Sequence, residues 1–239
     1  MTKHFPHPDH SPRAARDFDD AIIQQLYPGV PIEACDRVEH GRCTKQRLDG
    51  GWHFAELAQV DTSVGGASRA EIDAFRLLMA LVAHGDNKHD NQRLVCPVAA
   101  VGDDGRCTAP RLMVGDLGAT FGRGASCLLE LIDASSKASL KRWSAIPVWK
   151  SAERCQAYTS VRDGHSHPLI GEAGRALLAE KLAALTDAQL TDMFTASRVE
   201  RLDEPFTPEH GVERKGTVAD WVTTFKAKRA QIVDHRCPQ

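Results

Sequence analysis

The sequence predicts an α+β domain that is mainly helical, and three observations support this fold class. Segments with apolar residues at i, i+3 and i+4 spacing recur along the chain, and three of them begin at a Ser or Thr suited to capping a helix. Two short apolar runs, at 93–98 and 111–114, are joined by a polar loop, as in a β-hairpin. The chain has 239 residues, 42% hydrophobic and 26% charged, which is enough for a sizeable core.

The first fifty residues are expected to precede the main domain. Residues 1–16 are rich in His, Pro and charge, and we expect them to be disordered. Residues 17–50 are expected to form a short amphipathic helix over 17–26 and then an irregular lead-in. The main domain is therefore expected to span 51–239, and it opens with a period-2 pattern over 52–57 that predicts a strand.

The most regular pattern predicts a helix over residues 69–83. Ser68 and Glu71 have the spacing of a capping box, in which each side chain bonds the other residue's backbone amide. Apolar residues cover much of the circumference of this segment, so we expect the helix to be buried. Further helices are expected over 172–185, over 190–199 after a second capping box that starts at Thr186, and over 218–233 with Thr217 as the cap.

Two groups of side chains have no catalytic role in this interpretation. The tryptophans Trp143, Trp149 and Trp221 are expected to pack between helices rather than to stack on a ligand. The cationic residues of the last helix, among them Lys228, are expected to lie on a solvated face together with Lys226 and Arg229.

Charge and hydropathy exclude two classes of partner. Thirty basic and thirty-two acidic residues give a net charge of -2 with no sustained basic run, so nothing favours nucleic acid. No window approaches the roughly 20 apolar residues that cross a bilayer, so no membrane span is expected. The N-terminus has no apolar segment typical of a secretory signal. We expect a cytoplasmic protein, or an exported one if an upstream signal is missing from this chain.

The cysteines are dispersed, which argues against a metal cluster. None forms a C-x-x-C pair, and the odd number without a secretory signal favours reduced, buried thiols. Cys96 and Cys107 flank a predicted loop, so a disulfide between them is sterically conceivable. The seven positions are Cys35, Cys43, Cys96, Cys107, Cys127, Cys155 and Cys237.

Residues with catalytic potential gather after the predicted buried helix and after the second apolar run. Asp86 could orient or deprotonate an acceptor hydroxyl, and Lys88 could offset the charge of a moving phosphate. Asn91 and Asp116 are hard oxygen ligands of the kind that Mg²⁺ takes. Because the predicted hairpin joins the two segments, we expect Asp116 to lie beside Asp86 and Asn91. The residue types and their order indicate phosphoryl transfer.

The segment HGDNKHDN at 84–91, followed by DLG at 116–118, resembles the catalytic loop H-R-D-x-x-x-x-N and the D-F-G motif of the protein-kinase fold. The surrounding sequence, over about residues 50–235, resembles that of uncharacterised bacterial kinase-like proteins akin to the phosphatidylinositol-kinase and HipA-like branches. The resemblance implies ATP and Mg²⁺ as cofactors, with the nucleotide contacted by Lys88, Asn91 and Asp116. It also implies a structural role for His84 near the turn that Gly118 permits.

The resemblance covers only the large lobe of a kinase. We find no G-x-G-x-x-G loop, and Lys45, the only lysine between Lys3 and Lys88, is not on a recognisable strand. The expected fold is therefore a kinase-like large lobe whose β-hairpin carries the site, with the small lobe apparently absent. A separate partner chain could supply that lobe. The sequence does not identify the phosphate acceptor.

Three other interpretations stay open. The chain could be a non-catalytic pseudokinase or an interaction module. His84, Asp86, His89 and Asp90 could instead hold the metal of a hydrolase, although spacings of two and three residues on a loop are unspecific. The same polar residues could also simply cap nearby backbone at a solvated turn and a hairpin end.

Overall fold

The structure, a computed structural model, is a mixture of helices and short antiparallel sheets, as the α+β prediction requires. It describes residues 29–32, 35–40, 42–46, 57, 60, 63, 66–85, 91–103, 105–114, 117–118, 120–122, 138–159, 167–202, 205–208 and 211–238. The expected disordered segment 1–16 and the expected helix 17–26 lie outside these residues. So does the expected strand 52–57 apart from Leu57, which is buried against Ile72 and Met79.

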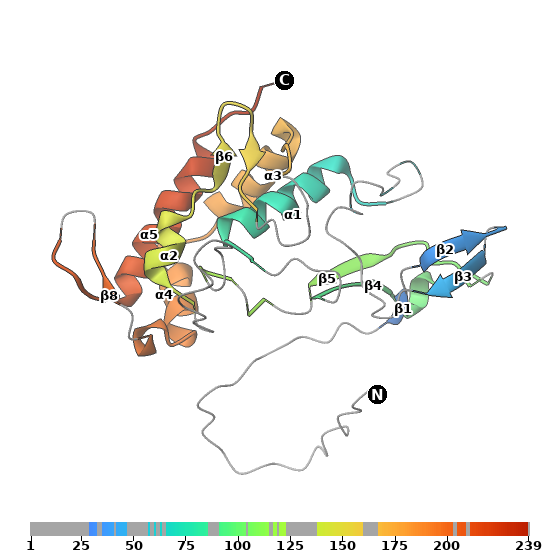
Figure 1. The fold of residues 1–239 in the computed structure, drawn as a ribbon, viewed down its shortest axis with the longest axis horizontal. Helices are drawn as coiled ribbons and strands as arrows, with labels where there is room; N and C mark the ends of the chain where they lie inside the picture. The colour runs from blue at the N-terminus through green and yellow to red at the C-terminus, as the bar shows by residue number, and fades with distance from the viewer. Residues whose placement is uncertain are drawn as a thin grey trace, which may run out of the picture.

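The helices form one body, and the β1–β4–β5 sheet with the β2–β3 hairpin extends to its side (Figure 1). Helix α1 (Arg69–Leu81) packs on α3 (Glu172–Ala183), and α3 packs on α5 (Val218–Val233). Helix α4 (Asp187–Ala196) packs on the other part of α5, and the short α2 (Leu140–Ala145) lies beside it. Among the described helices, none combines the length and the apolar character needed to cross a bilayer.

Three helices begin directly after the capping residues that the sequence identifies, because reciprocal side-chain bonds satisfy their first backbone amides. In each box the cap hydroxyl accepts from the third helical amide, while the side chain at that third position accepts from the cap amide. The pairs are Ser68–Glu71 for α1, Thr186–Gln189 for α4 and Thr217–Asp220 for α5. The prediction for α4 placed its start at residue 190, and the helix begins at Asp187, directly after its cap.

The core is aromatic at its centre, as expected for the tryptophans. The rings of Trp143 and Trp221 stack with centroids 5.6 Å apart, and both side chains are buried. The rings of Phe121 and Trp143 pack edge to face, with centroids 5.0 Å apart, and Phe194 of α4 packs on Trp143 with centroids 6.3 Å apart. Trp149 is also buried and donates from its indole nitrogen to the carbonyl of Gln231. These rings hold helices α2, α4 and α5 together.

One expectation about α5 is wrong. Lys228 is not on a solvated face: it is 3% exposed, donates to the carbonyl of Ile146, and lies 5.7 Å from the ring of Trp143. Burial lowers the pKa of Lys228 to about 8, because an ammonium group loses hydration inside the protein. Lys226 does reach solvent and pairs with Asp187. The two lysines therefore occupy different sides of α5, which the residue types alone do not distinguish.

The strands also correct the expectation of an irregular lead-in before residue 51. Strand β1 (Val30–Ile32) pairs antiparallel with β4 (Gln92–Cys96), which pairs antiparallel with β5 (Arg111–Val114). A separate hairpin joins β2 (Cys35–Glu39) to β3 (Arg42–Gln46). We expected residues 30–50 to be irregular. Instead β1 belongs to the same sheet as the β4–β5 hairpin. Pairing with β4 creates this strand, and β1 has no periodicity of its own that could predict it.

The remaining elements are short. Strand β6 (Trp149–Ser151) pairs with β7 (Gln156–Ala157), and β8 (Pro205–Phe206) pairs with β9 (Arg214–Lys215). Single 3₁₀ turns occupy η4 (Val98–Ala100) and η5 (Val199–Arg201). They complete the connections between the helices and the sheet.

Two disulfides replace the reduced thiols that the sequence favours. Cys96 and Cys107 are bonded across the β4–β5 connection, with Cα atoms 5.7 Å apart, so the conceivable pairing is present. Cys155 and Cys237 are bonded with Cα atoms 5.5 Å apart, although 82 residues separate them in the sequence. The second pair depends on the packing of α5 against the β6–β7 hairpin, which spacing along the chain cannot reveal.

Candidate functional site

The end of α1 turns the chain into the interior just before the predicted catalytic segment. The amide of Ala83 donates to the carbonyl of Ala80, and the amide of His84 donates to that of Met79 over 2.9 Å. This pair of bonds is a Schellman motif, which needs a left-handed residue, and Ala83 adopts it with φ 48°. His84 is consequently only 2% exposed. Its expected structural role near the Gly118 turn stays a prediction.

The chain returns to the same place after the hairpin. The amide of Phe121 donates to the carbonyl of Val82 over 2.7 Å, and the carbonyl of Phe121 accepts from the amide of Ser139. Gly122 follows with φ 82°, and a Cβ there would lie 2.6 Å from the backbone nitrogen of Trp143. Only glycine fits this close approach. Phe121 is thus fixed against the end of α1, and Gly122 lies against the start of α2.

Between these two points runs the β4–β5 hairpin. Asn91 immediately precedes β4 and is half-buried, and Gln92 pairs with Val114 at the end of β5. Strand β5 therefore ends, at Val114, at the same end of the hairpin where Asn91 precedes β4. Beyond it, Leu117 and Gly118 are exposed.

Several predicted site residues lie outside the described residues. They are Asp86 and Lys88 of the catalytic segment, Asp116 of the D-L-G segment, and His89 and Asp90 of the alternative hydrolase cluster. Of the predicted set, the structure describes His84, Asn91 and Gly118. It joins Phe121 to the end of α1 through the Val82 carbonyl, and it aligns Gln92, next to Asn91, with Val114 at the open end of the hairpin.

A hollow lies elsewhere on the described surface. It has a volume of about 340 Å³ and lies between α2, β8 and α5, where Phe206, Asp220 and Lys228 contribute to its walls. Arg214 lowers the pKa of Asp220 to about 2 by hydrogen bonding to its carboxylate. The lining of this hollow contains none of the residues predicted from the catalytic motif.

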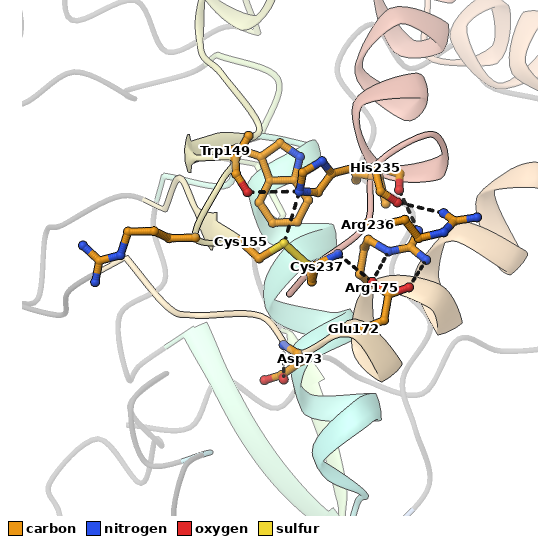
Figure 2. The surroundings of a disulfide bond; sticks show 12 residues. Asp73, Trp149, Cys155, Glu172, Arg175, His235, Arg236 and Cys237 are labelled. Carbon is orange, nitrogen blue, oxygen red and sulfur yellow. Dashed lines mark hydrogen bonds and ion pairs between the residues drawn. A yellow bond between two sulfur atoms is a disulfide. The ribbon is translucent and has the colours of Figure 1, made fainter. Parts of the chain in front are cut away.

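A second group of chemically capable side chains lies at the C-terminal end of α5. One ligand atom each from Cys155, His235 and Cys237 falls within 4.8 Å of the others. Nε2 of His235 is 3.2 Å from Sγ of Cys155 and 3.0 Å from the carbonyl oxygen of Ala152. Figure 2 shows the imidazole above the disulfide, with Trp149 behind it. Two thiolates and an imidazole are a donor set for zinc-class metals.

Sequence reasoning missed this second group. The dispersed cysteines argued against a metal cluster, and within this group of three only His235 and Cys237 are close in sequence. That spacing directly follows the predicted last helix and was the one available signal. Cys155 joins the group through the fold alone.

Comparison with known proteins gives no relative. Scans of protein-family models, of curated proteins and of solved structures each found no match to this chain. Function is therefore inferred from the residues and the described geometry.

Proposed function

We propose that this protein is a kinase-like phosphotransferase that uses ATP and Mg²⁺ on an acceptor hydroxyl. In this proposal Asp86 is the base, Lys88 contacts the phosphate, and Asn91 and Asp116 hold the metal. The fold is proposed to correspond to the large lobe of the protein-kinase-like fold. A partner chain that supplies the nucleotide-covering lobe is part of the same proposal.

The supporting observation is the path of the chain around the β4–β5 hairpin. A kinase-like site needs the catalytic loop and the D-x-G segment side by side, although a hairpin separates them in the sequence. Here Gln92 pairs with Val114, so Asn91 and the residues that follow β5 emerge at one end of the hairpin. The amide of Phe121 donates to the carbonyl of Val82, so Phe121 lies next to the residues that precede the proposed catalytic loop.

The residues fit the metal that this chemistry requires. Asn91 is half-buried at the open end of the hairpin, and its amide offers a hard oxygen of the type that binds Mg²⁺. Bound there, the metal would offset negative charge on the transferred phosphoryl group. Asn91 and Asp116 would hold it with few protein ligands, as Mg²⁺ prefers.

The proposed step transfers one phosphoryl group. The acceptor oxygen forms a bond to the terminal phosphorus of ATP while the bond from that phosphorus to the bridging oxygen breaks, so that ADP leaves. Asp86 accepts the proton of the acceptor hydroxyl. Lys88 places its ammonium against the charge that spreads over the phosphoryl oxygens.

A cytoplasmic location is part of the same proposal, because that compartment would supply the ATP; export remains the alternative. The same compartment keeps thiols reduced, whereas export would favour the two disulfides. Alkylation of the cysteines in freshly lysed source cells tests this part. Free thiols at Cys96, Cys107, Cys155 and Cys237 in the cell would support a cytoplasmic location, whereas retention of the two disulfides would support export.

Thermal unfolding with nucleotide tests the function. A ligand that binds the folded protein raises the melting temperature by mass action, and a hundredfold excess over Kd stabilises by about 2.7 kcal/mol. We expect ATP to raise the melting temperature, and Mg²⁺ to increase the shift. The absence of a shift at millimolar ATP would contradict the proposal.

Matched aspartate variants assign the metal ligand. Asp116→Asn should remove the Mg²⁺-dependent part of the shift and leave the folded protein intact. Asp103→Asn is the control, because Asp103 is exposed on the connection of the same hairpin. Equal Mg²⁺ dependence in both variants would remove Asp116 from the site. Binding without ATP consumption at any acceptor would favour the pseudokinase alternative.

A further inference from the structure

We propose that Cys155, His235 and Cys237 form a binding site for a zinc-class divalent cation once a cellular dithiol has reduced their disulfide. The proposal is independent of the kinase-like site, and it uses only residues that the structure describes. It assigns these three side chains two states, a disulfide beside an imidazole and a metal centre with two thiolates and one imidazole.

The three donor residues lie close enough together to reach a single cation once the disulfide between two of them is reduced. Their ligand atoms fall within 4.8 Å of one another, and Nε2 of His235 is 3.2 Å from Sγ of Cys155. A tetrahedral zinc ion with Zn–S bonds of about 2.3 Å places two sulfur ligands about 3.8 Å apart. The Cα atoms of Cys155 and Cys237 are 5.5 Å apart, so rotation of the two side chains suffices to open that space.

Contacts other than the disulfide hold the Cys237 side of the group. The amide of Cys237 donates to a carboxylate oxygen of Glu172 over 2.8 Å. Arg175 is buried and binds both oxygens of Glu172, and its remaining arm donates to the carbonyl of Ile232 over 2.8 Å. Figure 2 shows the bonds that join Cys237, Glu172 and Arg175, to the right of the disulfide. Arg175 also holds the carboxylate of Glu172 in its charged form, with its pKa lowered to about 2.

The other two donors are also held by local contacts. The ring of His235 lies 5.2 Å from that of Trp149, whose indole nitrogen donates to the carbonyl of Gln231 in α5. Cys155 ends a turn in which its amide donates to the carbonyl of Ala152, and its carbonyl accepts from the amide of Ile170. After reduction the two sulfurs therefore stay next to each other and next to the imidazole. A site that is held in place before binding loses less entropy when the metal arrives.

The metal centre would form in two steps, reduction of the disulfide and then binding of the cation. A cellular dithiol transfers two electrons and two protons to the Cys155–Cys237 disulfide, becomes a disulfide itself, and leaves two thiols. The cation then displaces one proton from each thiol and binds both sulfurs and the unprotonated Nε2 of His235. The imidazole proton lies on Nδ1 in this state, and the metal–nitrogen bond replaces the contact of Nε2 with the carbonyl of Ala152.

The donor set selects the class of metal. Two thiolates and an imidazole bind Zn²⁺ and its relatives, whereas Mg²⁺ and Ca²⁺ take oxygen ligands. Three protein ligands leave the fourth tetrahedral position for water or an exogenous ligand. Cys155 and Cys237 are buried and His235 is partly exposed, so a fourth ligand reaches the metal from the imidazole side.

Cobalt titration tests the proposal on the full chain. The protein is reduced with a phosphine, freed of metal, and titrated anaerobically with Co²⁺ while thiolate–cobalt absorption is recorded. We expect one Co²⁺ per chain, released when Zn²⁺ is added, and no binding by the oxidised protein. No thiolate–cobalt absorption in the reduced protein would overturn the proposal.

Matched variants identify the ligands. His235→Gln retains both cysteines, and hence the disulfide that keeps the oxidised protein folded, and it should weaken Co²⁺ binding by roughly tenfold or more. His167→Gln is the control, because His167 is half-buried and stacks on Tyr158 away from the disulfide. Unchanged binding in His235→Gln would remove the imidazole from the site and overturn the three-ligand assignment.

The second disulfide is an internal control for reduction. The double variant Cys96→Ser/Cys107→Ser should bind one Co²⁺ with unchanged affinity, since the metal-capable group among the described residues is at Cys155, His235 and Cys237. Loss of binding in this double variant, with binding retained in Cys155→Ser/Cys237→Ser, would place the metal at the hairpin instead and overturn the proposal. Intact-mass measurement under native conditions checks the stoichiometry in each case.

Discussion

The indole nitrogen of Trp143 donates to the carbonyl of Leu81 over 2.9 Å, although 62 residues separate the two in the chain. Trp143 lies in α2 and is fully buried, and Leu81 is the last residue of α1. The bond satisfies a carbonyl that the helix leaves without an intrahelical partner. It fixes the end of α1 immediately before the proposed catalytic segment.

Trp143→Phe should therefore lower stability. Phenylalanine keeps an aromatic ring but leaves the Leu81 carbonyl without its donor, which costs about 1–3 kcal/mol. Urea unfolding measures the change. Trp149→Phe is the comparison, because its acceptor belongs to the exposed Gln231, where water can replace the donor, and its cost should be smaller. Equal costs would show that the Leu81 bond has no special weight.

Gly174→Ala should destabilise the helix pair α1–α3. An alanine Cβ would lie 2.4 Å from Cβ of Asp73 and 3.0 Å from the carbonyl oxygen of Ala70, so the helices must separate. Overpacking of this kind costs about 1–3 kcal/mol. Thermal or urea unfolding checks the sign. Ala176→Gly, at an exposed position of α3, measures the intrinsic difference in helix propensity between Ala and Gly, and it should lower stability by about 1 kcal/mol. Stabilisation by Gly174→Ala would contradict the close approach.

Glu172 should contribute an acid-dependent part of the stability. Hydrogen bonding from Arg175 lowers the folded-state pKa of Glu172 to about 2, from an ordinary value of 4.5. A lowered carboxyl pKa gives stability that is complete above pH 4.5 and is lost as the pH falls towards 2. The stability difference between the wild type and Glu172→Gln should shrink over that range. Glu180→Gln, which removes only an exposed ion pair with Lys181, should not change how stability falls between pH 4.5 and 2.

Lys228 should make the free energy of unfolding depend on pH in the alkaline range. Burial lowers its folded-state pKa to about 8, while the unfolded chain binds the proton up to about 10.5. Between these values the unfolded state holds more protons, so this group makes stability rise with pH. Lys228→Met should lack that rise when urea midpoints are followed from pH 8 to 10.5. Lys226→Met, at a solvent-exposed pair on the same helix, should retain it.

Local signals predicted the helices well, because their ends are fixed by residues close in sequence. The box of Ser68 and Glu71 and the cap at Thr217 place the starts of α1 and α5 correctly, and the two apolar runs give the β4–β5 hairpin. These features depend on contacts over three or four residues or on a single turn. They could therefore be derived without knowing the fold.

Features that depend on distant packing were not predictable in the same way. Strand β1 exists because β4 offers it an edge, and the charge of Lys228 is hidden because α5 turns that side chain towards Trp143. The grouping of Cys155 with His235 and Cys237 likewise needs the β6–β7 turn to meet the end of α5. For the proposed kinase-like site, the sequence supplies the residues, and the described geometry supplies the hairpin that joins its two halves.

The bond between Phe121 and Val82 has a consequence for how this protein can change over evolution. The chain leaves the helical body after Val82 and re-enters it at Phe121, so the two ends of the intervening stretch meet at one junction. Residues can be added or removed in the exposed connection around Asp103 and Gly105 without displacing a helix. Differences in length between relatives should therefore concentrate in that connection, while the junction itself keeps its spacing.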